Sequence, residues 1–180
     1  MVIKAIKKMG VSHVRFTGGE PLLRKDLFSL IEYARRLRLK VWLNTNGSLI
    51  TKANAPKIKR FVENVLISLN GFDEASEFAV SKGSFKKKME GVDLLKGIGF
   101  LRAGIVLTTT NIQNLERYYQ LARKFDEIEF YRPIGFEVSK KLLKNAIVKI
   151  VDLNRKYERS FRIANPLPFC FFKPELLSIV

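Results

Sequence analysis

Small and polar residues follow the apolar, strand-length segments of this chain at each point where such a segment ends. In parallel α/β folds the carboxyl ends of the strands meet at one edge of the sheet, where ligands bind. Hydroxyl, amide and glycine backbone groups gathered there could hold a small polar ligand by hydrogen bonds. Glu20 is the only carboxylate among them, and no His, Lys or Cys joins it, so the set suits binding better than acid-base hydrolysis. The end segments are residues 17–21, 44–47, 68–71, 108–111 and 131–133.

Gly18-Gly19-Glu20-Pro21 is the most informative of these segments. The two glycines let the backbone approach a ligand closely or adopt a positive φ, and Glu20 offers a carboxylate to an ammonium or hydroxyl group. Pro21 stiffens the exit from the segment. A tight turn between a strand and a helix would use the same residues. From these residues alone, both interpretations stand.

Apolar periodicity predicts strands that alternate with helices along the chain. Asp26 and Ser84 are candidate helix caps, and Pro56 leaves the first half of the helix at 51–61 open. Because helix-length segments separate the strands and no hairpin signals occur, we expect right-handed crossovers and a parallel sheet. The fold class is therefore α/β, either an open doubly wound sheet or a barrel. We expect strands at 12–17, 40–45, 64–69, 102–108, 127–131 and 161–164, and helices at 2–9, 26–37, 51–61, 84–95, 114–125 and 138–159.

Composition excludes several classes of protein. The 180 residues, 47% hydrophobic and 28% charged, suit one packed domain. A lone Cys170 cannot form an internal disulfide, and a zinc or iron-sulfur site needs about three or four ligands. No apolar run reaches the ~18 to 20 residues of a membrane span, and lysines interrupt the N-terminus where a signal peptide is apolar. The cytoplasm is the expected compartment, with no membrane partner.

The formal charge of +16 has two interpretations. Such an excess attracts phosphates, nucleic acid or acidic lipid. It also arises when surface lysines serve solubility and ion pairing. The basic residues are spread along the chain, and the short clusters at 35–38 and 86–88 fall within helical patterns, where a charge run usually faces solvent. That distribution favours the second interpretation.

The segment VRFTGGEPLLRKDLFSLIEYARRLRLKVWLNTNG resembles the second through third strands of radical S-adenosylmethionine (radical SAM) enzymes. The similarity continues through ISLNG, which is similar to the family's fourth-strand SLDG, and through TTNIQNLER after the next strand. The resemblance covers most of residues 1–160 and implies a partial (β/α)6 TIM-like barrel of parallel strands. It also implies an enzyme at the family level, with S-adenosylmethionine as cofactor.

The resemblance assigns roles to particular residues. Gly18, Gly19 and Glu20 would contact the amino group of S-adenosylmethionine. Asn70 stands where the family usually has Asp, which weakens the match at that strand. The resemblance also implies that Thr45, Asn46 and Asn114 line the cofactor. Ser68 would lie near the ribose and the carboxylate of S-adenosylmethionine.

The resemblance also implies parts that this chain lacks. In the family, a first strand and a CxxxCxxC loop precede the helix expected at 2–9, and the three thiolates of that loop hold a 4Fe-4S cluster. The first βα unit is therefore expected to be missing, the cluster ligands are absent here, and the chain is expected to be inactive alone. No catalytic or metal-binding residue is assigned. Cys170 lies in NPLPFC, which is similar to the start of the extension that carries auxiliary clusters in SPASM-type, peptide-modifying members. The expected division is a barrel at 1–160 and an extension at 161–180.

Three further hypotheses concern partners. Intact relatives would act on a peptide or another small molecule. As an alternative function, the basic surface would bind nucleic acid or another polyanion on a barrel remnant, and this binding would weaken steeply with salt. If the first strand is missing, the strand at 13–17 has an unpaired edge, which favours a homodimer through that edge.

Overall fold

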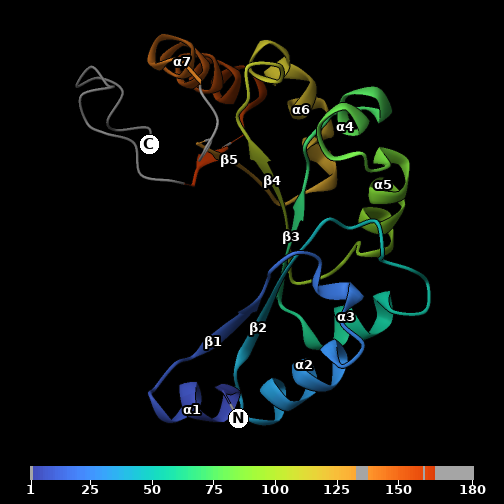
Figure 1. Ribbon diagram of the computed structural model, residues 1–180. Coiled ribbons are helices and arrows are strands. Elements are labelled where there is room, and N and C mark those ends of the chain that lie inside the picture. Colours follow the sequence, from blue (N-terminus) through green and yellow to red (C-terminus); the bar gives the residue numbers. More distant parts are fainter. Residues whose placement is uncertain (1, 133–137, 160, 165–180) are drawn as a thin grey trace.

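The computed structural model describes residues 2–132, 138–159 and 161–164. A six-stranded, fully parallel sheet has the strand order β1-β2-β3-β4-β5-β6. Because each strand pairs with the next one in sequence, the order never reverses as it does in a doubly wound sheet. The sheet curves as a partial barrel (Figure 1), which confirms the predicted fold class. The strands are β1 (His13–Phe16), β2 (Lys40–Thr45), β3 (Asn64–Ser68), β4 (Phe100–Val106), β5 (Glu127–Tyr131) and β6 (Arg162–Ile163).

Helices connect successive strands, and α2 to α6 lie along the outer side of the curved sheet (Figure 1). The α-helices are α1 (Val2–Lys8), α2 (Leu27–Arg36), α3 (Ala55–Phe61), α4 (Glu74–Ser81), α5 (Phe85–Leu94), α6 (Leu115–Leu121) and α7 (Lys140–Tyr157). Short 3-10 helices are η1 (Pro21–Leu23), η2 (Ile112–Asn114) and η3 (Ala122–Lys124). None of the helices described is both long and apolar enough to cross a membrane.

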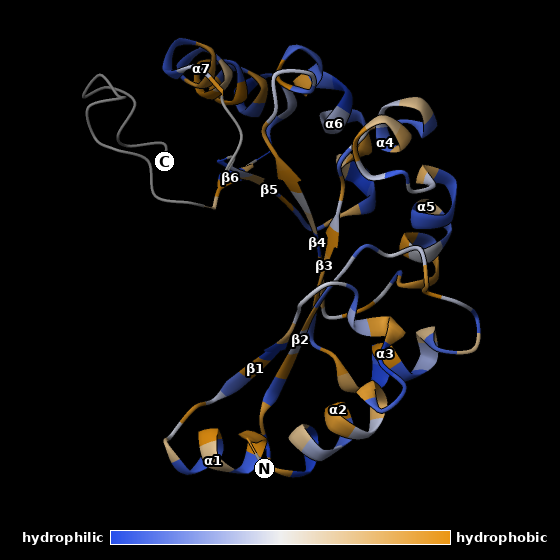
Figure 2. Cartoon of the chain, viewed as in Figure 1, coloured by the Kyte–Doolittle hydropathy of each residue, from blue (hydrophilic) through white to orange (hydrophobic). Residues whose placement is uncertain are grey.

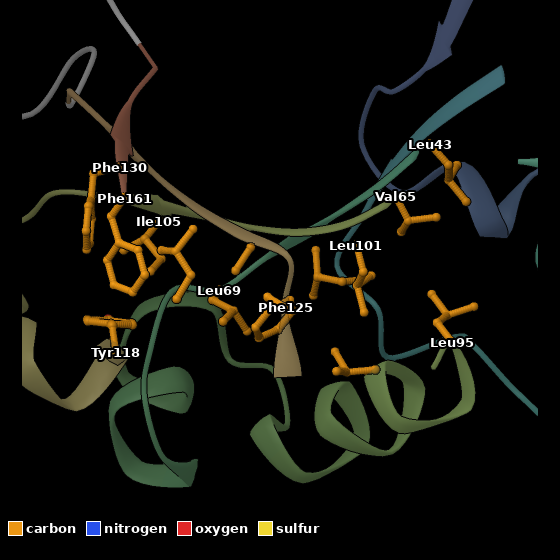
Figure 3. Close-up of a cluster of buried hydrophobic side chains, with 14 of the residues drawn as sticks. Leu43, Val65, Leu69, Leu95, Leu101, Ile105, Tyr118, Phe125, Phe130 and Phe161 are labelled. Atoms are coloured by element: carbon orange, nitrogen blue, oxygen red, sulfur yellow. The ribbon is translucent and has the colours of Figure 1, made fainter. Parts of the chain in front are cut away.

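The hydrophobic core lies between the sheet and the outer helices. Alternate strand residues point toward the helices, as Leu43, Val65 and Leu101 do in Figure 3, and join a core that includes Leu95, the C-cap residue of α5. The apolar segments of the strands and of the inner helix surfaces are visible in Figure 2. This core holds the strands in register, so it sets where the carboxyl ends of the strands lie.

The other strand residues form the inner, concave face of the sheet, which is strongly polar. It carries Arg15, Asn44, Asn64, Arg102 and Glu129, which alternate with core residues along their strands. Trp42 also lies on this face and is only partly buried, with His13 stacked on it at 4.6 Å between ring centroids. Trp42 therefore lies outside the apolar core, because strand alternation puts it on the opposite face of β2 from the core residues Val41 and Leu43.

Three local features differ from the expectations or complete them. Asp26 occupies the N-cap position of α2 but makes no capping hydrogen bond, because its carboxylate pairs with Arg24 at 2.6 Å. Helix α3 begins only at Ala55, with Pro56 in its first turn, where a missing N–H costs nothing. Helix α4 was not expected at all. It begins after Asp73 with a reciprocal capping box between Asp73 and Ser76.

Candidate functional site

The carboxylate of Glu20 joins the end of β1 to the end of β2. Its Oε1 accepts hydrogen bonds from the Thr45 hydroxyl at 2.7 Å and from the Leu22 amide at 3.0 Å. Its Oε2 accepts one from the Asn46 amide at 2.7 Å. Three of the predicted cofactor-binding residues, Glu20, Thr45 and Asn46, are thus brought into direct contact. A carboxylate oxygen has room for about two hydrogen bonds, so Oε2 can accept one more from a ligand.

The two glycines before Glu20 leave space that a ligand could use. Gly18 has a φ of +147°, which L side chains rarely adopt. A Cβ atom built on Gly19 would meet nothing within 4 Å, and both glycines are exposed. The main chain here is open beside the fixed Glu20 carboxylate, which is the group that can accept hydrogen bonds from the ammonium of a ligand.

A buried ion pair fixes the end of β3, where Ser68 lies. Lys88 of α5 and Glu77 of α4 are 2.6 Å apart and almost fully buried, at 2% and 0% exposure. The Lys88 ammonium also donates to the Ser68 carbonyl at 2.8 Å. The Glu77 carboxylate accepts from the amides of Asn70 at 3.1 Å and Gly71 at 2.9 Å. These contacts hold the main chain at 68–71 in one conformation.

The pKa of Glu77 reflects this network. Burial raises the pKa, but hydrogen bonds from Lys88, Ser81 and the Gly71 amide outweigh burial and hold it below the usual value. Glu77 is therefore a carboxylate at neutral pH and keeps accepting these bonds. Both residues are structural supports of the site, since neither side chain is open to solvent.

Asn114 lies farther along the same edge, after β4. It is partly buried at the end of η2, and its amide donates to the Thr110 carbonyl at 3.4 Å. Asn111, which was not singled out, shapes this loop, because its side chain bonds the amide of Thr108 at 2.8 Å and the carbonyl of Val106 at 2.7 Å. Ser68 and Asn114 thus lie at neighbouring strand ends, whereas the direct contacts link only Glu20, Thr45 and Asn46.

An iron-sulfur cluster does not fit the residues described. Among residues 2–132, 138–159 and 161–164 no group of three or more His, Cys, Asp or Glu is arranged to hold a metal ion. Cys170, the predicted auxiliary-cluster residue, lies outside the described residues, as does most of the predicted extension at 161–180. His13 is exposed on β1 and stacks on Trp42.

Comparison with known proteins identifies the family to which this fold and these strand-end residues belong. The radical SAM superfamily matches residues 1–125. The chain belongs to the radical SAM superfamily. It is 33% identical over 124 residues to the AdoMet-dependent heme synthase of Oleidesulfovibrio alaskensis, covering 67% of this chain and 32% of the relative. It is also 33% identical over 142 residues to the mycofactocin maturase MftC of Mycolicibacterium smegmatis, covering 74% of this chain and 36% of that protein. The radical SAM segment thus spans about a third of the length of these curated relatives.

Solved structures share the radical SAM fold seen here. Streptococcus suis SuiB bound to S-adenosylmethionine superposes with a TM-score of 0.81 at 20% identity, over 98% of this chain and 43% of SuiB. Native anSMEcpe with bound AdoMet gives a TM-score of 0.72 at 18% identity, over 90% of this chain and 52% of anSMEcpe. Both likenesses concern the fold.

Sequence reasoning missed the supporting residues of this radical SAM domain. Lys88 was interpreted as part of a solvated charge run, yet it is buried and binds Glu77. One signal was available, because Lys88 lies three and four positions from Phe85 and Val92, on the apolar side of α5. For the polar cluster around Arg102 on the concave face, only strand alternation gave a hint.

Proposed function

We propose that this chain binds S-adenosylmethionine at the carboxyl ends of β1, β2 and β3, as the cofactor-binding part of a radical SAM enzyme. The observation that carries the proposal is the Glu20 carboxylate, fixed by Thr45 and Asn46 beside the open backbone of Gly19. An anchored carboxylate next to accessible amides complements the ammonium and carboxylate of an amino acid moiety.

The residues at the strand ends have different parts in this proposed binding. The remaining acceptor position on Glu20 receives an N–H of the cofactor's ammonium group. The open main chain at Gly18 and Gly19 lets the methionyl part lie against β1. Ser68, held by the Lys88 contact to its carbonyl, presents its hydroxyl from β3, and Asn46 and Asn114 line the rim. When bound, S-adenosylmethionine supplies the 5′-deoxyadenosyl group that this family uses in radical chemistry.

The cluster that reduces the cofactor in this family needs three thiolates, and the chain has one cysteine. We therefore propose that the ligands come from outside these 180 residues and that the chain alone does not cleave S-adenosylmethionine. The substrate of the complete enzyme is proposed to be a peptide or another small molecule. A maturase among its relatives and the anSMEcpe structure with a Kp18Cys peptide support this choice.

The two other hypotheses about partners have no specific support in the structure. Binding of nucleic acid or another polyanion rests on net charge, and homodimerisation rests on the edge of β1. Both stay predictions, and neither is needed for the proposed function.

Substitutions at Glu20 and Gly19 test the proposal without cleavage chemistry. In equilibrium dialysis against labelled S-adenosylmethionine, Glu20→Gln should weaken binding roughly 10- to 100-fold, because a charge-assisted hydrogen bond is worth about 1.5–3 kcal/mol. Gly19→Ala should also weaken it, since the methyl group fills the open space, while the free energy of unfolding changes by less than about 0.5 kcal/mol.

Glu32→Gln is the matched control, because Glu32 is a partly buried carboxylate on α2, on the outer side of the sheet. It should bind the cofactor as the unmodified chain does. Equal affinity in all four proteins, or no binding by a folded chain, would show that the strand ends are not a cofactor site.

A further inference from the structure

A cluster of polar side chains on the concave face lies below the proposed cofactor site. Arg102 of β4 pairs in register with Leu66, whereas Ser68 pairs with Gly104. Arg102 is therefore two residues deeper than Ser68, or about 6–7 Å along the strand. This places it away from the strand ends where S-adenosylmethionine is proposed to bind.

The guanidinium of Arg102 is buried and held from two sides. Its Nε donates to the Asn64 side chain at 3.0 Å, and its Nη1 donates to Glu129 at 2.5 Å. Arg102 is 7% exposed and Glu129 is 4% exposed. Burial raises the pKa of Tyr131 to about 12, so its hydroxyl stays protonated and donates to the second Glu129 oxygen at 2.6 Å. The network fixes the guanidinium in one orientation.

Part of this guanidinium has no hydrogen-bond partner. The Nη2 atom of Arg102 is buried and donates to no acceptor among the described residues, and the Asn44 side-chain oxygen on the same face likewise accepts from no donor. A buried donor without an acceptor costs about 1–3 kcal/mol. Since Glu129 and Asn64 already orient the side chain, the unpaired Nη2 is not needed for that purpose.

The surroundings of Arg102 favour an anion joined to an apolar body. The Arg102 guanidinium carbon lies 5.8 Å from the centroid of Trp42, and that of Arg15 lies 4.8 Å from the same ring. Two guanidinium groups therefore lie near one indole ring, while Glu129 compensates the charge of Arg102 alone. Guanidinium groups bind carboxylates more strongly than neutral acceptors.

The geometry points to Arg102 as the anchor for a carboxylate of the substrate, with Trp42 packing against the apolar part next to it. This inference rests on the proposed function for the presence of a substrate on this face. It assigns a specificity-determining residue and a substrate class, namely molecules with a carboxylate beside an aromatic or aliphatic group.

Trp42 is the only tryptophan in the chain, so its fluorescence reports directly on this face. Phenylacetate should change the Trp42 emission of the full chain in a saturable way, whereas its neutral isostere phenylacetamide should not. Arg102→Met should weaken the phenylacetate response about tenfold or more. Arg15→Met is the matched control, because it removes the other cation at Trp42 and should leave most of the phenylacetate affinity.

Arg102→Met leaves Glu129 buried without its partner, so the double variant Arg102→Met, Glu129→Gln provides a second, charge-balanced test and should also lose phenylacetate binding. A phenylacetate response that is absent, that phenylacetamide matches, or that persists in both Arg102 variants would overturn the inference. So would a loss of S-adenosylmethionine affinity in Arg102→Met with phenylacetate unaffected. If phenylacetate binds through Arg102 but the unmodified chain does not bind S-adenosylmethionine, the anchor stands and the proposed function fails.

Discussion

Replacing Lys88 with methionine is expected to lower the free energy of unfolding by about 3–5 kcal/mol. The substitution removes the ammonium that lies 2.6 Å from Glu77 and leaves that carboxylate with no exposed surface and no counter-charge. It also removes the bond to the Ser68 carbonyl, so the end of β3 loses a support. Urea denaturation followed by circular dichroism measures the loss.

Lys87→Met is the control for Lys88→Met. Lys87 is the preceding residue on the same helix and is exposed, so its loss should change stability by less than about 0.5 kcal/mol. Adding Glu77→Gln to Lys88→Met should recover part of the lost stability, because the unpaired charge is then removed. A Lys88→Met protein as stable as Lys87→Met would mean that the ion pair does not hold the loop at 68–71.

Gly71→Ala is expected to destabilise the fold by about 3 kcal/mol or more, since overpacking against rigid backbone is costly. A Cβ atom at this position would lie 2.1 Å from the Glu77 amide nitrogen and 2.6 Å from the Ser76 carbonyl carbon. Both atoms belong to the backbone of α4, so the first turn of that helix would have to move. Thermal or urea unfolding would measure the effect.

The comparison for Gly71→Ala is Gly19→Ala, where the added Cβ meets nothing within 4 Å. The two variants make the same chemical change at two strand ends, and only Gly71→Ala should impair folding. If both unfold at the same urea concentration, the close approach of Gly71 to α4 does not exist in solution.

Sequence periodicity was sufficient to predict the strands of the sheet, and all six expected strands are present. Each of β1 to β4 carries a run of apolar or alternating residues that ends at or shortly before a glycine, asparagine or threonine, and such runs are a local signal. The capping residue Ser84 was also predicted correctly, because its hydroxyl accepts from the Lys87 amide at 3.3 Å. Local chemistry decides both features, so no knowledge of distant contacts was required.

Features that depend on distant contacts could not be predicted in the same way. Helix α4 has only eight residues, and its apolar residues Phe78 and Val80 are exposed. The apolar residues of this segment therefore do not mark a buried helix face, and periodicity alone does not predict the helix. Lys88 is buried because its ammonium binds Glu77 and the Ser68 carbonyl. The number and spacing of charged residues in the sequence do not reveal these contacts. Among the candidate residues, the predicted cluster of Glu20, Thr45 and Asn46 forms, because their positions follow from adjacent parallel strands.

Chemical-shift perturbation by S-adenosylmethionine tests the central claim most directly, because backbone amide signals of the ¹⁵N-labelled chain locate the bound cofactor. We expect shifts at Gly18, Gly19, Asn46 and Ser68, at the carboxyl ends of β1 to β3. A cavity of about 610 Å³ on the outer side, next to α5, is the natural competitor and is lined in part by Ser48, Thr51, Lys87 and Glu90. Shifts confined to that outer cavity, or no shifts at saturating cofactor, would contradict the account.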